Sequence, residues 1–204
     1  MGGSAEASSR FIINLIKGSN PEDALKDTVI VKQVTLGISN IEDSIFLKKL
    51  YPEEYVHVAL FISDQEPDRF EEKGIVLEYG KYESKCNSNG EMKYEYINGG
   101  MRYGWVELKE FQEKLASDVS INLDIQPLLL FRDLIEKIKS DDDKWDFDSY
   151  SGLNHNCQHF CAKAIKILKA KLNYNCVNIK NNERHKHGKK KDIIPQIIRE
   201  AFES

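Results

Sequence analysis

Four consecutive segments between residues 55 and 108 constrain the fold most, because their composition and their turns are typical of strands. Residues 55–62 (YVHVALFI) are apolar apart from one histidine, and residues 74–79 (GIVLEY) follow an acidic loop. Residues 92–97 (MKYEYI) alternate cleanly, and residues 103–108 (YGWVEL) follow a Gly99-Gly100 turn. This spacing and turn chemistry favour antiparallel neighbours. We therefore expect an antiparallel sheet, with the tip of a hairpin at residues 86–91.

The rest of the chain predicts one earlier strand and a mostly helical remainder. Residues 28–36 (TVIVKQVTL) are rich in β-branched side chains and predict a strand that ends at Gly37. Apolar residues at helical spacing continue after residue 108. The fold class expected is α+β, an antiparallel sheet of about four to six strands packed against helices. The helices are expected at residues 11–16, 41–51, 108–116, 127–138, 157–172 and 193–202.

Composition sets the class of protein. With 204 residues, 41% of them hydrophobic, the chain is long enough to bury a core, and its net charge of −4 provides no general attraction for nucleic acid. No apolar run approaches the roughly 18 residues of a membrane span, and no secretory signal is visible. We expect a cytoplasmic protein with a flexible N-terminus (residues 1–10), a single domain (residues 11–180), and a basic loop with a C-terminal amphipathic helix (residues 181–204).

The motif that carries chemistry is Asn156-Cys157-Gln158-His159-Phe160. Asparagine is a good N-cap, which places Cys157 in the first turn of the following helix. Unpaired backbone N–H groups and the positive end of the helix dipole stabilise a thiolate there. The backbone N–H of Cys157 is also a natural donor to an oxyanion.

A thiolate needs a histidine within hydrogen-bond reach to act as a nucleophile. His57 is the best candidate, since it stands alone in an otherwise apolar strand. Glu78 belongs to the next strand, and its carboxylate can orient the imidazole of His57. We therefore predict a catalytic group of Cys157, His57 and Glu78.

The order of these motifs resembles the circularly permuted branch of the papain-like (NlpC-type) superfamily, in which the histidine strand precedes the cysteine helix. The resemblance covers residues 55–172 and extends to two groups. Lecithin:retinol acyltransferase-like proteins carry an Asn-Cys-Glu-His-Phe motif, and the PPPDE isopeptidases carry Asn-Cys-Asn-x-Phe. His159 matches the first group and Gln158 matches neither, while Glu78 stands where the acyltransferases have a second histidine.

The resemblance implies a cysteine hydrolase in which Cys157 is the nucleophile and His57 is the general base. Asn156, Gln158 and His159 are assigned to the surroundings of the nucleophile and its oxyanion. The expected substrate is a peptide or isopeptide bond, with conjugates of ubiquitin-like proteins among the candidates, bound in a cleft between the cysteine helix and the histidine strand. One alternative is a thiol acyltransferase or phospholipase-like enzyme that takes an acyl substrate. Another is a non-catalytic binding module on the same fold.

Structural roles compete with these assignments. Cys157 could be a small buried hydrophobe, His57 a hydrogen-bonded core histidine, and Glu78 a solvent-facing strand residue. Cys161 shares the apolar stripe of its helix and is expected to pack in the core.

A zinc site is the remaining alternative, because His155, Cys157, His159 and Cys161 occupy seven consecutive residues. On one helix, however, His159 points well away from Cys157. No second pair of ligands with suitable spacing occurs outside the basic loop at residues 184–191. We expect neither a metal nor another cofactor.

Overall fold

The structure is a computed structural model that describes most of the chain outside several loops and the N-terminal segment. The helices expected at residues 11–16 and 41–51, and the basic loop, lie outside the described residues. The described residues are 21–26, 28–40, 56–64, 73–88, 91–113, 115, 117–123, 129–140, 144–146, 148–151, 154–179 and 194–204.

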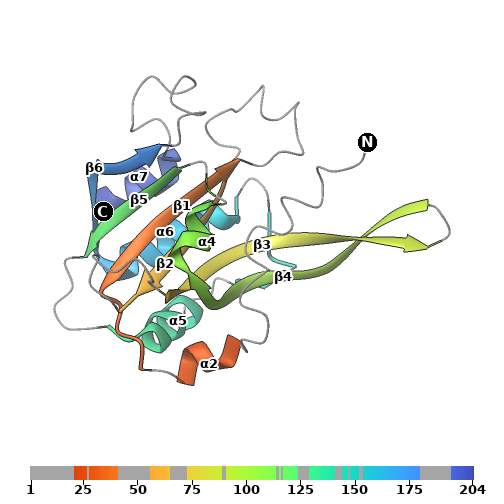
Figure 1. Cartoon of the computed structure of the whole chain (residues 1–204), viewed down its shortest axis with the longest axis horizontal. Coiled ribbons are helices and arrows are strands. Elements are labelled where there is room, and N and C mark those ends of the chain that lie inside the picture. The colour runs from red at the N-terminus through yellow and green to blue at the C-terminus, as the bar shows by residue number, and fades with distance from the viewer. Residues whose placement is uncertain are drawn as a thin grey trace.

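Six strands form one antiparallel sheet in the order β4-β3-β2-β1-β5-β6. The α+β class with an antiparallel sheet is therefore confirmed. β3 and β4 form a long hairpin whose end extends away from the other strands (Figure 1). The strands are β1 (Gln33–Asn40), β2 (Val56–Ser63), β3 (Lys73–Ser88), β4 (Glu91–Glu107), β5 (Ser117–Leu123) and β6 (Ala170–Ile179).

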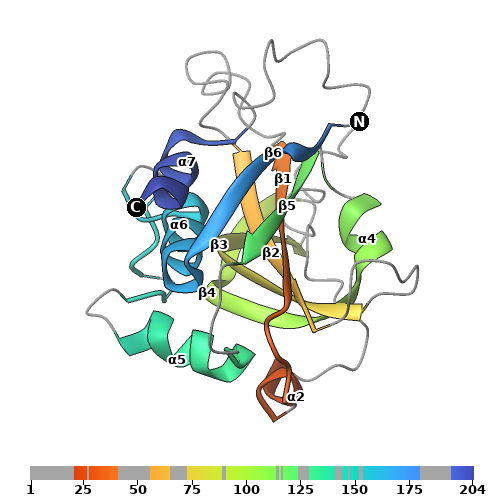
Figure 2. The same cartoon turned by 90° about the vertical axis from the view of Figure 1, so that its left-hand side faces the viewer.

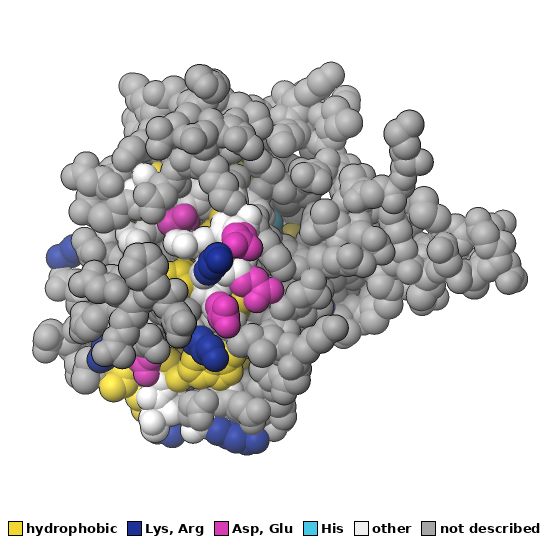
Figure 3. Space-filling view, viewed as in Figure 1, with side chains coloured by type: hydrophobic (Ala, Val, Ile, Leu, Met, Phe, Trp, Pro, Cys, Tyr) yellow, Lys and Arg dark blue, Asp and Glu magenta, His cyan; other side chains and the backbone are white. Residues whose placement is uncertain are grey.

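Helices cover both faces of the sheet. Figure 2 shows α6 and α7 on one side of the strands and α4 on the other. On the face seen in Figure 3, acidic and basic side chains of the described residues lie next to one another, and α4 carries Lys109 as well as Glu110 and Glu113. The helices are α2 (Pro21–Lys26), α4 (Leu108–Glu113), α5 (Phe131–Ser140), α6 (Cys157–Leu168) and α7 (Gln196–Glu203).

The alternation of β2 divides the core between the two faces. Val58, Leu60 and Ile62 belong to the large core under α6, whereas Ala59 and Phe61 belong to a smaller core under α4. Phe61 stacks there on Phe111, with ring centroids 5.5 Å apart. Because both faces of β2 are covered, its sequence is apolar almost throughout, as is typical of a central strand.

The strand expected at residues 28–36 is shifted, because β1 begins at Gln33 and continues through Gly37 to Asn40. Gly37 does not end the strand but lies beneath α4. A Cβ atom at this position would lie 2.5 Å from Cζ of Phe111 and 2.8 Å from Cδ2 of Leu115. Glycine is needed there for close packing between a strand and a helix.

The expected turn at Gly99-Gly100 was also wrong, since β4 runs as one strand through both glycines. Gly100 has a φ of +108°, which L side chains rarely adopt. The amide of the next residue, Met101, donates to the carbonyl of Trp145 at 2.9 Å. The glycine therefore lets a separate segment approach β4 instead of reversing the chain.

The helical expectation after residue 108 missed two strands, β5 and β6. The helix expected at residues 157–172 ends at Leu168, followed by Lys169 in the left-handed conformation with φ 48°. Leu172, expected on the helix, instead pairs with Ile121 across β5 and β6. Pairing between distant segments therefore outweighs the helical pattern of residues 169–172.

Candidate active site

Asn156 begins α6 as the sequence predicts. Its backbone is extended, and its side-chain oxygen accepts hydrogen bonds from the amides of Gln158 at 3.0 Å and His159 at 3.3 Å. Just before it, Ser151 and His155 form two backbone hydrogen bonds of 2.8 and 3.2 Å. This turn and the cap together set the direction in which α6 starts, which places Cys157 at the first helical position.

Cys157 meets the beginning of β2. Its Sγ atom donates to the carbonyl oxygen of Val56 at 3.8 Å, although the two residues are 101 positions apart in the sequence. Only 3% of Cys157 is exposed, and its thiol is free. The first turn of α6 is thus docked on the residue that immediately precedes His57.

His57 and Glu78 form a largely buried pair on adjacent strands. Nε2 of His57 lies 3.0 Å from Oε2 of Glu78, and the side chains are 15% and 2% exposed. Alternation places both on the face of Ala59 and Val76, opposite the face that α6 covers. Glu78 is therefore not a solvent-facing strand residue, and that interpretation is wrong.

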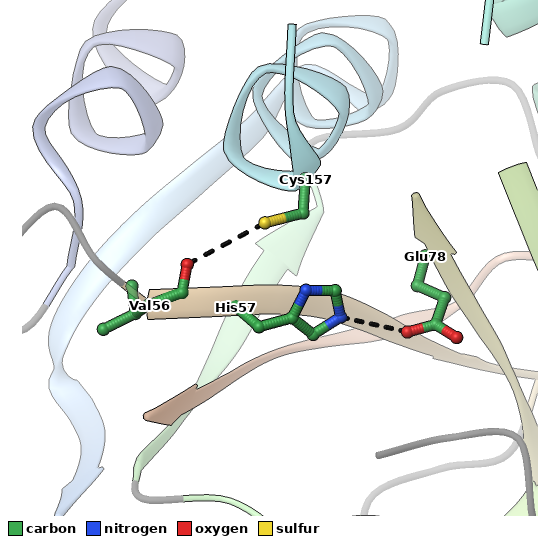
Figure 4. Close-up of polar contacts among 4 residues, drawn as sticks. All are labelled: Val56, His57, Glu78 and Cys157. Atoms are coloured by element: carbon green, nitrogen blue, oxygen red, sulfur yellow. Dashed lines mark hydrogen bonds and ion pairs between the residues drawn. The ribbon is translucent and has the colours of Figure 1, made fainter. Parts of the chain in front are cut away.

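The imidazole of His57 lies between the sulfur and the carboxylate (Figure 4). Its Nε2 is turned to Glu78, and its other ring nitrogen is on the side of Cys157. Cys157 reaches this pair, on the other face of the sheet, because α6 starts beside Val56, the first residue of β2. The three predicted catalytic side chains are thus brought together by α6, β2 and β3.

Charge and burial act in opposite directions on His57. Burial alone lowers its pKa, because it disfavours the imidazolium ion. The charge of Cys157 and a hydrogen bond to it raise the pKa, as do a hydrogen bond to Glu78 and the charge of that residue. The raising effects prevail and bring the pKa of His57 to about 10. The site therefore favours a positively charged imidazole between two groups that carry negative charge when ionised.

Gln158 and His159 make contacts around the nucleophile. Gln158 is 7% exposed, and its Nε2 donates to the same Val56 carbonyl at 3.3 Å. Nδ1 of His159 lies 2.9 Å from the side-chain oxygen of Asn156. Burial, and then the charge of His155, lower the pKa of His159. Both side chains thus hold the start of α6 in place.

Cys161 packs one helical turn below Cys157, as the sequence suggests. It is fully buried, and burial raises its pKa well above the ordinary value, with smaller contributions from Cys157 and Glu78. Cys161 is therefore kept as a neutral thiol. Among the described residues, no group of three or more His, Cys, Asp or Glu residues is arranged to hold a metal ion.

Sequence reasoning missed two features of the site. The first is the Val56 carbonyl, which is a backbone group and leaves no signature in the residue type. The second is the hydrogen bond that the hydroxyl of Tyr79, a fully buried residue next to Glu78, donates to the carbonyl of Asp146 at 2.9 Å. The ring of Tyr79 also contacts Trp145 and His155, with centroids 5.0 and 5.6 Å away. It anchors the segment that leads into Asn156.

Comparisons of the chain with protein-family models, curated proteins and solved structures find no match. In the described part of the chain, no helix has the length and apolar character needed to cross a membrane. The function must therefore be inferred from the site itself.

Proposed function

We propose that this protein is a cysteine hydrolase of the circularly permuted papain-like type. The observation that carries the proposal is the position of His57, which lies between Cys157 at a capped helix start and the buried carboxylate of Glu78. A nucleophile, a base and a group that orients the base are the parts needed for covalent catalysis. The order of the motifs along the chain supports the same assignment.

The proposed reaction has two halves. Transfer of the Cys157 proton to His57 gives a thiolate–imidazolium pair, and the thiolate attacks the carbonyl carbon of the substrate to form a C–S bond. The imidazolium then gives its proton to the departing amine as the C–N bond breaks, leaving a thioester. A water molecule loses a proton to His57 and attacks the thioester. The C–S bond breaks and the carboxylic acid product is released, which leaves the Cys157 thiolate beside the protonated His57 and so restores the starting pair.

Two groups stabilise charge in these steps. Glu78 accepts the Nε2 hydrogen of His57, which leaves the other ring nitrogen to face the sulfur and stabilises the imidazolium. The amide of Cys157 is the donor that we assign to the oxyanion. The cap does not use it, since the side-chain oxygen of Asn156 takes the amides of Gln158 and His159.

The proposed substrate is a peptide or isopeptide bond, with conjugates of ubiquitin-like proteins in the cytoplasm as the first class to test. The acyltransferase alternative is less favoured for two reasons. Glu78 replaces the second histidine of that group, and the apolar side of α7 packs on α6, with Ile198 and Ala201 buried, instead of facing a lipid. The non-catalytic alternative predicts that Cys157 has no unusual reactivity.

The test is the rate at which each cysteine reacts with iodoacetamide, followed by mass spectrometry at mildly acidic pH. We expect Cys157 to react fastest, and His57→Ala to slow its reaction. In parallel, ubiquitin-like proteins and peptides with an electrophilic C-terminus are tested for a covalent adduct with Cys157. With a cleavable substrate, His57→Ala should lower kcat/KM by roughly 10²–10⁴-fold.

Cys161→Ala is the matched control, because it removes a buried thiol from the same helix and leaves the proposed nucleophile in place. It should retain the adduct, whereas Cys157→Ala should lose it. Equal reactivity of Cys157 in the wild type and in His57→Ala would overturn the proposal and favour a binding module.

A further inference from the structure

Two donors from α6 converge on one backbone oxygen at the start of β2. The thiol of Cys157 and the side-chain amide of Gln158 both donate to the carbonyl of Val56, at 3.8 and 3.3 Å. Gln158 is 7% exposed, so this bond is formed away from bulk water. A buried amide that lost its acceptor would incur a desolvation cost, so the contact ties the two elements together firmly.

Ionisation of Cys157 changes what this carbonyl faces. In the resting thiol the sulfur donates a hydrogen to the oxygen, but a thiolate has no hydrogen to donate. Negative sulfur and the negative end of a carbonyl dipole then face each other in surroundings of low dielectric, where repulsion is strong. The N–H group of Gln158 stays on the oxygen in both states and offsets part of its negative charge.

We propose that Gln158 is a positioning residue, which holds the start of α6 against Val56 and reduces the repulsion between the Val56 carbonyl and a thiolate at Cys157. This inference rests on the proposed function, because it assumes that Cys157 gives its proton to His57. In the described part of the chain, the other ionisable groups that act on Cys157 or His57 are Glu78 from β3 and Cys161 from α6. Glu78 and Cys161 are kept in the wild type and in all Gln158 variants, so a difference between these proteins reports the effect of Gln158.

The test follows His57 directly, by nitrogen NMR of isotope-labelled histidine over a range of pH. Gln158→Met keeps the length of the side chain but cannot donate. The variant should make ionisation of Cys157 less favourable, so that less negative charge lies beside His57. The pKa of His57 should then fall by about one pH unit, the size expected when one hydrogen bond that favours a charged state is lost. Gln158→Asn, which is too short to reach Val56, is the second variant and should shift the pKa in the same direction. Gln196→Met, on the exposed side of α7, should have no effect.

The Cys157→Ala background separates the two ideas. If Gln158 acts through the thiolate, Gln158→Met should change nothing further once Cys157 is alanine. An equal shift with and without the sulfur, or no shift in either Gln158 variant, would overturn the role of Gln158 while the proposed function stands. If Cys157→Ala itself leaves the titration of His57 unchanged, the cysteine–histidine pair is absent and the proposed function fails.

Discussion

At the scale of single residues, the chemistry of the site depends on which charges surround His57. Burial disfavours the imidazolium, yet the pKa of His57 is raised to about 10, because Cys157 and Glu78 supply opposing negative charge and hydrogen bonds. Below that pH the imidazole carries a positive charge beside the sulfur, and above it the charge is lost. An anionic reagent should therefore be attracted to Cys157 only on the acid side of the transition.

Glu78→Gln should move this transition to lower pH. The variant keeps the size of the side chain and an oxygen for Nε2 of His57 but removes the carboxylate charge. Since an opposite charge within a few ångströms shifts a pKa by about 1–3, we expect a decrease of roughly one pH unit or more. The measurement is the ratio of the rates at which iodoacetate and iodoacetamide modify Cys157, followed as a function of pH.

Glu136→Gln provides the control, because that carboxylate lies exposed on α5. In this variant the ratio of the iodoacetate rate to the iodoacetamide rate should fall at the same pH as in the wild type. A Glu78→Gln protein with the wild-type profile would show that the 3.0 Å contact does not control the charge of His57.

At the scale of elements, the start of α6 depends on one side chain. Asn156 accepts two backbone amides and also lies 2.9 Å from Nδ1 of His159. These contacts satisfy amides that have no partner within the helix. The cap therefore both stabilises the helix and places Cys157 at the beginning of β2.

Asn156→Ala should lower the free energy of unfolding by about 1 kcal/mol, the usual cost of removing an N-cap. It should also slow alkylation of Cys157, because the first turn of α6 loses its fixed direction. Urea denaturation measures the first effect, and Asn154→Ala, at a nearby exposed asparagine, is the control. Similar losses of stability in the two variants would mean that the cap has no special role.

At the scale of the whole molecule, α7 closes the core over α6. Its residues Ile198 and Ala201 are buried, at 0% and 4% exposure, and both belong to the large core. The apolar side of this C-terminal helix therefore packs within the domain and does not face a lipid surface.

Ile198→Ala should lower the free energy of unfolding by about 2–5 kcal/mol, because it leaves a cavity against α6. Ile197→Ala, which removes the same atoms from a half-buried neighbour, should cost less. Urea denaturation gives both values, and vesicle sedimentation of the wild type tests lipid binding. Equal losses, together with sedimentation on vesicles, would indicate that α7 faces a membrane instead of the core.

Local patterns were sufficient for the parts of the site that lie within one element. Apolar composition predicted β2 around His57, and capping chemistry predicted the helix that begins at Cys157. The order of strands placed Glu78 beside His57, and the structure shows their side chains in contact. Each of these predictions needs only a short stretch of sequence, because strand periodicity and helix capping act over a few consecutive residues.

The tertiary structure alone decided what lies between elements. β5 exists because it pairs with β1, and β6 because it pairs with β5. Gly37 and Gly100 continue strands because other segments pack closely on them. The Val56 carbonyl became part of the site because α6 docks on it. A backbone oxygen is present in every residue type, so the sequence does not predict that contact. The sequence by itself determined which side chains could react. Pairing and packing between distant segments determined that they meet, since those interactions depend on the whole chain.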